Sequence, residues 1–293
     1  MPLVRNVALL VNPTAGRGRG ARAAAETARR LRGAGVTVEV LSGRDVDEAG
    51  ELARRAVRKE PDALVAVGGD GLTHTAVQAL AGTDVPLAIV SCGTGNDIAT
   101  ALGVPLDPSA AAATVLGGVP RRIDLGRAGA RWFAGVLCAG FDSAVTERTN
   151  QLRWPRGRMR YNLAVVLELG VFRPVPFLLE LDGVERRLDA MLVAVGNTGQ
   201  YGGGLRICPG AEPDDGLFEV VVVHPVPRRE LVRVFPQLYS GRHVSHPQVS
   251  VHVAKTVALA APDVPAYADG ERVGALPVRA EVVPNALTVL TAP

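Results

Sequence analysis

The first stretch of about 125 residues alternates short apolar runs with amphipathic segments. This alternation constrains the fold most, because strands that alternate with helices form a parallel sheet covered by helices, with right-handed crossovers. The expected strands cover residues 7–11, 37–41, 63–67 and 87–90. The expected helices cover residues 21–31, 45–59 and 71–80, and a stretch that starts at residue 97.

After about residue 124 the pattern changes to short β-rich runs separated by turn signals such as Asp182-Gly183. Short strands joined by frequent turns are typical of an antiparallel β-sandwich. The expected strands cover residues 132–138, 177–181, 191–195, 217–223, 249–253 and 286–290, with a single helical segment at 160–172. The sequence therefore predicts an α/β domain followed by a β-sandwich domain, packed closely over a cleft.

The composition indicates an ordinary folded protein, with 293 residues, 47% hydrophobic and 21% charged. The net charge of +3 is too small to indicate nucleic-acid binding, so no nucleic-acid partner is expected. No apolar run reaches about 18–20 residues, and no signal peptide is visible at the start, so we expect neither a transmembrane helix nor secretion. The three separated cysteines, Cys92, Cys138 and Cys208, indicate reduced thiols in a cytoplasmic protein.

Three glycine-rich turns, at 12–18, 68–71 and 93–97, follow expected strands. In a parallel sheet the turns after the carboxyl ends of the strands share one edge, where ligands bind. Glycines let main-chain amides approach a ligand closely, and each helix N-terminus adds a partial positive charge. Each turn alone is equally well explained as a tight turn, but the three together predict a phosphate cradle.

Asp70 lies among the glycines of the second turn, where its carboxylate would repel a phosphate. At about 4 Å and an effective dielectric of about 20, one such repulsion costs roughly 4 kcal/mol. A bridging Mg²⁺ would remove the repulsion, because this ion binds one or two carboxylates together with phosphate oxygens. The alternative is an aspartate that only shapes the turn.

Other phosphate-binding motifs fit less well. Neither lysine, Lys59 or Lys255, follows a glycine, so the chain has no Walker A loop, and the protein-kinase signatures are missing. Residues 16–21 fit the dinucleotide fingerprint G-x-G-x-x-A, with Glu39 about 20 residues further on. That fit keeps an NAD(P)-dependent oxidoreductase as an alternative, but it leaves the second and third turns unexplained.

Eight segments, in order along nearly the whole chain, resemble the diacylglycerol kinase catalytic family, which also includes sphingosine kinases and bacterial lipid kinases. The segments are 10–16, 67–71, 93–97 with 101–103 behind it, 123–126, 140–142, 196–197 with 201–204, 213–217 and 269–271. The resemblance implies a Rossmann-like, phosphofructokinase-like nucleotide-binding domain at 1–127 and a β-sandwich lipid-substrate domain at 128–283. It also implies a tail at about 284–293 that returns to the first domain.

The same resemblance implies an ATP-dependent lipid kinase, and we expect it to convert diacylglycerol to phosphatidic acid. The implied nucleotide contacts are Asn12, Pro13, Thr14, Ala15, Gly16, Ser42, Gly68, Gly69, Asp70, Gly71, Thr73, Gly93, Thr94 and Asn96.

The resemblance also implies the catalytic and metal-binding residues. Asp269 would be the general base, Glu271 and Asp70 would complete the catalytic set, and Asp124 would join the acidic network around the base. Besides the Mg²⁺ at the phosphates, a structural Mg²⁺ would bind Asp215, helped by main-chain oxygens near Glu212 and Leu217.

The chain departs from the family pattern after the second glycine turn. Leu72, His74 and Thr75 stand where the family usually has Thr, Asn and Glu, and the Pro that usually precedes the third turn is replaced around Ser91. We expect His74 to substitute for the Asn and the nucleotide contacts to differ in detail.

Arginines alternate with aromatic residues in segment 153–161, which contains Trp154 and Tyr161. Basic residues near an anionic leaflet contribute about 1 kcal/mol each, and Trp and Tyr favour the membrane interface. We therefore expect a cytoplasmic protein that associates peripherally with the inner face of the membrane. A solvated loop is the alternative, and the oligomeric state is open, with a homodimer as one expectation.

Two further functions stay open. NAD kinase shares the Gly-Gly-Asp-Gly turn and the two-domain plan, but its Asn-Glu pair is not found near His74. A non-catalytic nucleotide-binding regulatory protein would suit the departures at Leu72 and Thr75. The acceptor is also open, because sphingoid bases, monoacylglycerols, phosphatidylglycerol or a glycolipid could replace diacylglycerol.

Overall fold

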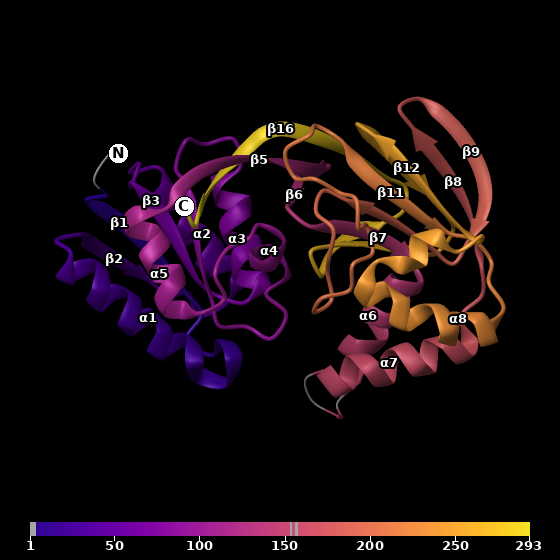
Figure 1. Ribbon diagram of the computed structural model, residues 1–293, viewed down its shortest axis with the longest axis horizontal. Coiled ribbons are helices and arrows are strands. Elements are labelled where there is room, and N and C mark those ends of the chain that lie inside the picture. The colour runs from indigo at the N-terminus through magenta and orange to yellow at the C-terminus, as the bar shows by residue number, and fades with distance from the viewer. Residues whose placement is uncertain (1–3, 153, 156–157) are drawn as a thin grey trace.

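The computed structural model describes residues 4–152, 154–155 and 158–293, which form two halves (Figure 1). The elements of the first half are β1 (Asn6–Val11), α1 (Ala15–Gly33), β2 (Thr37–Leu41), α2 (Val46–Val57), β3 (Ala63–Gly68), α3 (Asp70–Leu80), β4 (Leu87–Ser91), α4 (Asp97–Ala101) and α5 (Pro108–Gly117).

A parallel sheet in the order β2-β1-β3-β4 forms the centre of the first half. β3 is buried at every position, as expected for an apolar strand that helices cover on both faces. Helices α1 and α5 pack on one face of the sheet, and α2 and α3 pack on the other. The turns after β1, β3 and β4 therefore lie at one edge.

The second half begins with β5 (Val119–Ala128), β6 (Arg131–Phe133) and β7 (Val136–Gly140), followed by α6 (Phe141–Gln151) and α7 (Arg158–Val171). It continues with β8 (Val175–Leu181), β9 (Val184–Ala190), β10 (Leu192–Gly196), β11 (Phe218–Val223), α8 (Arg228–Val234) and the 3-10 helices η1 (Phe235–Ser240) and η2 (Arg242–Ser245). The last strands are β12 (Val249–Ala254), β13 (Thr256–Ala260), β14 (Pro265–Ala268), β15 (Glu271–Ala275) and β16 (Val278–Thr291).

The second half is a sandwich of antiparallel strands. One sheet has the order β12-β11-β10-β7-β14-β15, and the facing layer contains β9, β8, β13, β16, β5 and β6. A core of buried apolar side chains from both layers fills the space between them. Within it the fully buried rings of Phe133 and Phe218 stack with 5.6 Å between their centroids. The expected fold class is confirmed.

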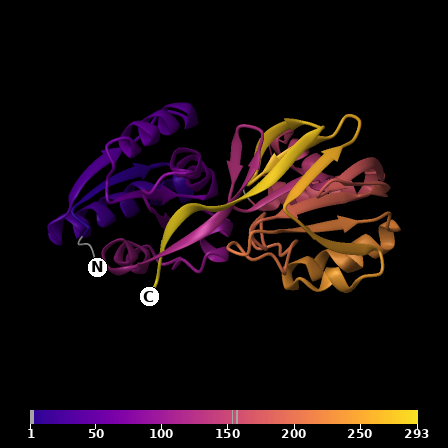
Figure 2. The same ribbon diagram turned by 90° about the horizontal axis from the view of Figure 1, so that it is seen from above.

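Strands β5 and β16 run from one half into the other (Figure 2). The start of β16 pairs with β13 of the sandwich, where Val278 lies opposite Leu259. Its end pairs in parallel with β4, where Val289 lies opposite Leu87. The two halves are therefore tied by continuous strands rather than by a linker.

The structure corrects two expectations for the second half. The single strand expected at 132–138 is two strands, because Ala134 and Gly135 separate β6 from β7. The single helix expected at 160–172 is one of several, since α6 and α8 were missed. The sequence of α6 shows only a weak helical pattern; tertiary packing of Val145 against α7 stabilises it instead. Among the described residues, no helix combines the length and the apolar character that a membrane span requires.

Candidate active site

The three glycine turns meet at the edge of the parallel sheet. A Cβ atom on Gly16 would lie 1.9 Å from the carbonyl oxygen of Cys92, just before the third turn. A Cβ atom on Gly93 would lie 2.6 Å from the Cα atom of Gly69, in the second turn. Any side chain at either position would collide with the neighbouring turn, so the close approach requires glycine.

The first turn has a main-chain conformation suited to anions. Gly16, Arg17 and Gly18 are left-handed, with φ angles of 58°, 62° and 90°. Consecutive amides in such turns can point into one concavity and bind an anion. Arg19 fixes this turn, because its Nε donates to the oxygen of Gly16 at 3.0 Å and its Nη2 to the oxygen of Gly93 at 3.2 Å. In the sequence, Arg19 is recognisable only as a basic residue near a turn.

A cavity of about 390 Å³, which we call the glycine-turn cavity, opens over these turns. Its lining residues are Val11, Asn12, Pro13, Thr14, Ala15, Gly16, Gly43, Arg44, Asp45, Val46, Ala49, Gly69, Gly71, Leu72, Thr75, Gly93 and Glu271. Most of the residues expected to contact ATP therefore share one cavity, and Leu72 lines it at the position where the family usually has Thr.

Other expected nucleotide residues lie outside this cavity. Ser42 lines a neighbouring hollow between α1 and β2, which shares Val11 and Pro13 with the cavity. Gly68 is buried at the end of β3, and Thr73 is buried with its hydroxyl directed at the oxygen of Gly69, 3.4 Å away.

The Asp70 carboxylate braces the third turn. Its Oδ2 accepts a hydrogen bond from the amide of Asn96 at 2.7 Å, and its Oδ1 accepts one from the amide of Ile98 at 3.3 Å. These bonds stabilise a left-handed Asn96, whose φ is 59°. Asp70 thus stabilises the third turn, a contact that its position in the second turn did not predict.

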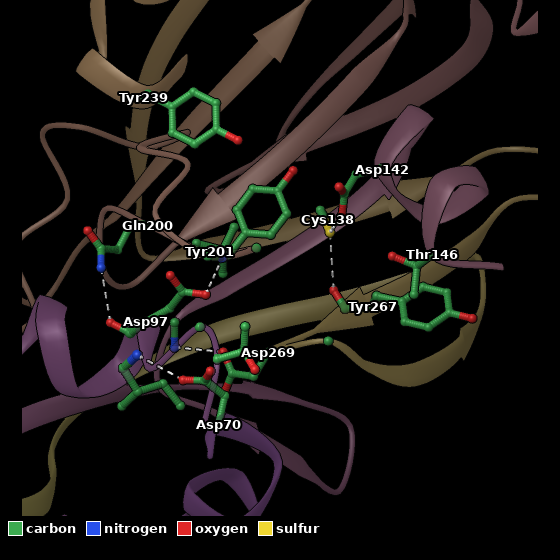
Figure 3. Close-up of a pocket in the computed structure, with 18 residues that line it drawn as sticks. Asp70, Asp97, Cys138, Asp142, Thr146, Gln200, Tyr201, Tyr239, Tyr267 and Asp269 are labelled. Carbon is green, nitrogen blue, oxygen red and sulfur yellow. Dashed lines mark hydrogen bonds between the residues drawn. The ribbon is translucent and has the colours of Figure 1, made fainter. Parts of the chain in front are cut away.

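A second cavity, of about 400 Å³, lies between the two halves, and we call it the interdomain cavity (Figure 3). Its lining residues are Asp70, Thr94, Gly95, Asp97, Ile98, Gly135, Val136, Cys138, Asp142, Thr146, Gln200, Tyr201, Gly202, Gly203, Tyr239, Tyr267, Asp269 and Gly270. It brings Asp70 and Thr94 of the first half together with Asp269 of the second.

Asp269 enters this cavity from the turn between β14 and β15, with a φ of 52°. Its Oδ1 accepts a hydrogen bond from the amide of Gly135 at 2.8 Å, and its Oδ2 accepts one from the amide of Ala134 at 2.9 Å. Nδ1 of His74 lies 3.2 Å from the same Oδ2. The carboxylate is therefore held in one orientation by both halves of the protein.

Asp97 joins the two halves at the other side of the cavity. Its Oδ2 and Oδ1 accept hydrogen bonds from the amides of Gly203 and Gly204 at 2.7 and 2.8 Å. Gln200 donates to the main-chain oxygen of Asp97 at 3.3 Å (Figure 3). The sequence placed Asp97 and the glycines of 201–204 in separate motifs and could not show that they bind each other.

The Asp124 carboxylate binds two main-chain amides from segments far apart in the sequence. Its Oδ2 accepts a hydrogen bond from the amide of Gly216 at 2.7 Å, and its Oδ1 accepts one from the amide of Asn285 at 2.8 Å. The side chain is buried and lines neither cavity. It therefore anchors the 213–217 turn to β16.

That turn carries the residues expected to bind a structural Mg²⁺. Asp215 and Glu212 are exposed, and Oδ1 of Asp215 accepts a hydrogen bond from the amide of Leu217 at 2.9 Å. Within the described residues, no three His, Cys, Asp or Glu side chains gather as a metal cluster. A cation here would rely on one carboxylate and on main-chain oxygens, which are ligands that Mg²⁺ accepts.

The phosphate edge also offers carboxylates for a nucleotide-bound Mg²⁺. Glu271 lines the glycine-turn cavity. Its side chain lies beside the start of α3, because its Oε1 would be 3.8 Å from a Cβ atom placed on Gly71. Mg²⁺ bound with a nucleotide needs only one or two carboxylates beside phosphate oxygens and water. Glu271 and Asp70 fit that requirement.

The far end of the interdomain cavity is less reactive. Burial raises the pKa of the Cys138 thiol well above its usual range, and Asp142 raises it further, so this cysteine is not a nucleophile. Burial and a hydrogen bond to Glu147 raise the pKa of Tyr267 to about 12. Asp142 and Tyr201 also line an apolar chamber of about 70 Å³ between the helices and the sheet.

Glycine turns on one domain and a buried aspartate on the other, brought to one cleft, are the arrangement that a two-domain kinase requires. The diacylglycerol kinase catalytic domain family matches residues 6–128, and the YegS C-terminal NAD kinase β-sandwich-like domain family matches residues 135–291. The chain belongs to the diacylglycerol kinase family and is a lipid kinase, which confirms the resemblance seen in the sequence.

Curated relatives agree with this assignment. A diacylglycerol kinase of Mycobacterium tuberculosis is 44% identical over 98% of this chain and 95% of its own length. One of Bacillus subtilis is 28% identical over 94% of this chain and 92% of its own. A YegS-like lipid kinase of Pseudomonas fluorescens is 35% identical over 75% of this chain and 73% of its own.

Solved structures share the fold. A diacylglycerol kinase from Bacillus anthracis superimposes with a TM-score of 0.76 at 19% identity, covering 100% of this chain and 98% of the other. An NAD kinase from Archaeoglobus fulgidus, solved with ATP, gives a TM-score of 0.54 at 14% identity, covering 98% and 92%.

Proposed function

We propose that this lipid kinase transfers the γ-phosphoryl group of ATP to the hydroxyl of diacylglycerol and so forms phosphatidic acid. The observation that carries the proposal is the position of Asp269, which lines the interdomain cavity together with Asp70 of the second glycine turn and Thr94 of the third. Residues 1–127, with the tail 284–293, would bind the nucleotide, and residues 128–283 would bind the lipid.

The proposed reaction places the phosphates of ATP over the amides of the three turns. The lipid hydroxyl lies in the interdomain cavity, in line with the γ-phosphorus, and Asp269 accepts its proton. Because the transition state of phosphoryl transfer is loose, most of the rate comes from positioning and from charge stabilisation. Mg²⁺, held by Asp70 and Glu271, would neutralise charge on the phosphates.

The charge of the interdomain cavity favours an uncharged acceptor. Four aspartates line it, Asp70, Asp97, Asp142 and Asp269, and among the described residues that line it there is no Arg, Lys or His. An anionic head group such as that of phosphatidylglycerol would be repelled, whereas diacylglycerol presents only a hydroxyl. The adjoining apolar chamber has room for only a few methylene groups of an acyl chain.

The proposed membrane contact is the outer face of α7. Met159 and Val166, two turns apart on one side of α7, are apolar and exposed at 67% and 64%. Val171, at the end of the helix, is exposed at 58%, and the neighbouring Trp154 is exposed at 77%. Exposed apolar side chains on a surface helix are typical of membrane-docking faces. Arg153, Arg156 and Gly157 of the expected docking segment lie outside the described residues.

The test is transfer of labelled γ-phosphate from ATP to a panel of acceptors in mixed micelles. The panel contains diacylglycerol, monoacylglycerol, sphingosine, phosphatidylglycerol and, as a soluble acceptor, NAD. We expect diacylglycerol to be labelled at least about tenfold faster than phosphatidylglycerol. Labelling of NAD alone, or ATP binding without transfer to any acceptor, would refute the proposal.

A further inference from the structure

We propose that His74 is a positioning residue that orients the carboxylate of Asp269 for proton transfer. The inference rests on the proposed function, in which Asp269 is the general base. His74 belongs to α3, next to the second glycine turn, and Asp269 lies 195 positions further along the chain. Their side chains are exposed at only 6% and 2%.

His74 contacts Asp269 from outside the two cavities. Asp269 lines the interdomain cavity, whereas His74 lines neither this cavity nor the glycine-turn cavity. The substrate therefore approaches the carboxylate from one side and the imidazole contacts it from another. His74 does not touch the lipid or the nucleotide in this arrangement, so it acts only through Asp269.

The contact defines the tautomer of His74. Its Nδ1 lies 3.2 Å from Oδ2 of Asp269, and in the described part of the chain its buried Nε2 has no hydrogen-bond partner. A lone pair on Nδ1 would face the lone pairs of the carboxylate, so the proton belongs on Nδ1, which donates. This tautomer leaves the Nε2 lone pair without a partner. That loss of free energy is smaller than the gain from the Nδ1 bond, because a hydrogen bond to a charged carboxylate is stronger than one between neutral groups.

His74 directs the reaction to one oxygen of the carboxylate. Oδ2 accepts bonds from His74 and from the amide of Ala134, whereas Oδ1 accepts one, from the amide of Gly135. The freer Oδ1 takes the proton of the lipid hydroxyl while the hydroxyl oxygen bonds to the γ-phosphorus. The bond from that phosphorus to its bridging oxygen breaks, ADP leaves with the electron pair, and His74 keeps its Nδ1 proton.

Two substitutions separate the hydrogen bond from packing. Leucine in His74→Leu fills similar space without a donor, and we expect kcat to fall about 10- to 100-fold with the KM for ATP unchanged. Asparagine in His74→Asn carries its amide nitrogen on Cγ, as histidine carries Nδ1, so it keeps a donor at the same distance from the main chain. We expect His74→Asn to stay within about threefold of the wild-type kcat.

Gln78 supplies a matched control, since it lies one turn further along α3 and also binds the second half. Its Nε2 donates to the oxygen of Trp132 at 2.7 Å, and its Oε1 accepts from the amide of Trp132 at 3.0 Å. Gln78→Leu therefore removes contacts between the halves without touching Asp269. It should lower the melting temperature while kcat stays within about threefold of wild type.

The decisive measurement is a double-mutant cycle with Asp269→Asn, using diacylglycerol in mixed micelles. If His74 acts through Asp269, His74→Leu costs nothing further in kcat once Asp269 is replaced. Equal losses in both backgrounds, or a His74→Asn enzyme as slow as His74→Leu, would overturn the inference. If Asp269→Asn itself leaves kcat unchanged, the proposal that Asp269 is the general base is refuted instead. The result therefore distinguishes a wrong role for His74 from a wrong role for Asp269.

Discussion

The amide nitrogen of Gly135 lies 2.8 Å from Oδ1 of Asp269. Gly135 is one of the two residues that separate strand β6 from strand β7. The interruption divides an apolar run that would suit one strand into two strands. It leaves the consecutive amides of Ala134 and Gly135 free to bind the Asp269 carboxylate. A Cβ atom on Gly135 would lie 2.6 Å from the same oxygen, so glycine is needed for the contact. The strand break and the proposed base therefore form one structural unit.

Asp269→Asn should lower kcat by about 10²- to 10⁴-fold, the usual contribution of a general base. The dissociation constant for ATP should stay nearly unchanged, because Asp269 does not line the glycine-turn cavity. Steady-state transfer and calorimetric ATP binding measure the two quantities. A variant that keeps its kcat would show that Asp269 is not the base.

Asp97→Ala should lower the free energy of unfolding by about 1.5–3 kcal/mol and raise the KM for lipid, because the amides of Gly203 and Gly204 lose a charged acceptor. Asp107→Ala is the control, since Asp107 only caps α5 by accepting from the amide of Ala110. It should cost about 1 kcal/mol without changing the KM. Urea unfolding and lipid titration test both, and equal KM values for the two variants would contradict the prediction.

Mg²⁺ should raise the melting temperature of the protein if Asp215 binds a structural ion, because a ligand at 100 times its Kd stabilises by about 2.7 kcal/mol. Asp215→Ala should abolish this rise. Asp214→Ala is the neighbouring control, because Asp214 pairs with Nη2 of Arg121 at 2.7 Å, and it should keep the rise. Melting curves of the wild type that are identical with Mg²⁺ and with EDTA would argue against the site.

Stability should decrease in acid partly through His243. Burial lowers the pKa of His243 below its usual 6.5, against the opposing effect of its hydrogen bond to the oxygen of Ile207. The unfolded chain therefore binds a proton more readily, so this stability is present above pH 6.5 and is lost as the pH falls through 6.5 toward the folded pKa.

His243→Gln should flatten the decline in the free energy of unfolding between about pH 7.5 and 5.5, as measured by urea unfolding at each pH. The decline should shrink rather than vanish, because burial lowers the pKa of His252 as well. His246→Gln is the control from the adjoining segment. An unchanged slope in His243→Gln would remove His243 as a cause.

Val166→Asp and Val171→Asp should weaken binding to anionic vesicles by about tenfold or more each, since each replaces an exposed apolar side chain on α7 with a charge. Val184→Asp is a matched control, because Val184 on β9 is exposed at 58%, as Val171 is. Vesicle co-sedimentation compares the three variants. Equal binding of all three would exclude α7 as the docking face.

The sequence by itself determined the architecture and the residues of the phosphate edge. Alternating strands and helices specify a parallel sheet, and turns that follow its strands must then share an edge, so local patterns place residues 12–16, 68–71 and 93–97 together. Local patterns were weaker in the second half, where α6 forms because it packs on α7 rather than because of its own propensity.

Only the tertiary structure decided which side chains meet across the two halves. His74 and Asp269 are 195 positions apart, and Asp97 reaches Gly203 over 106 positions. Hydrophobic periodicity and turn signals describe neighbours along the chain, so they carry no information about such pairs. The packing of the second half against the first determines which residues pair. It brings each polar group next to a hydrogen-bond partner that replaces water in the buried site.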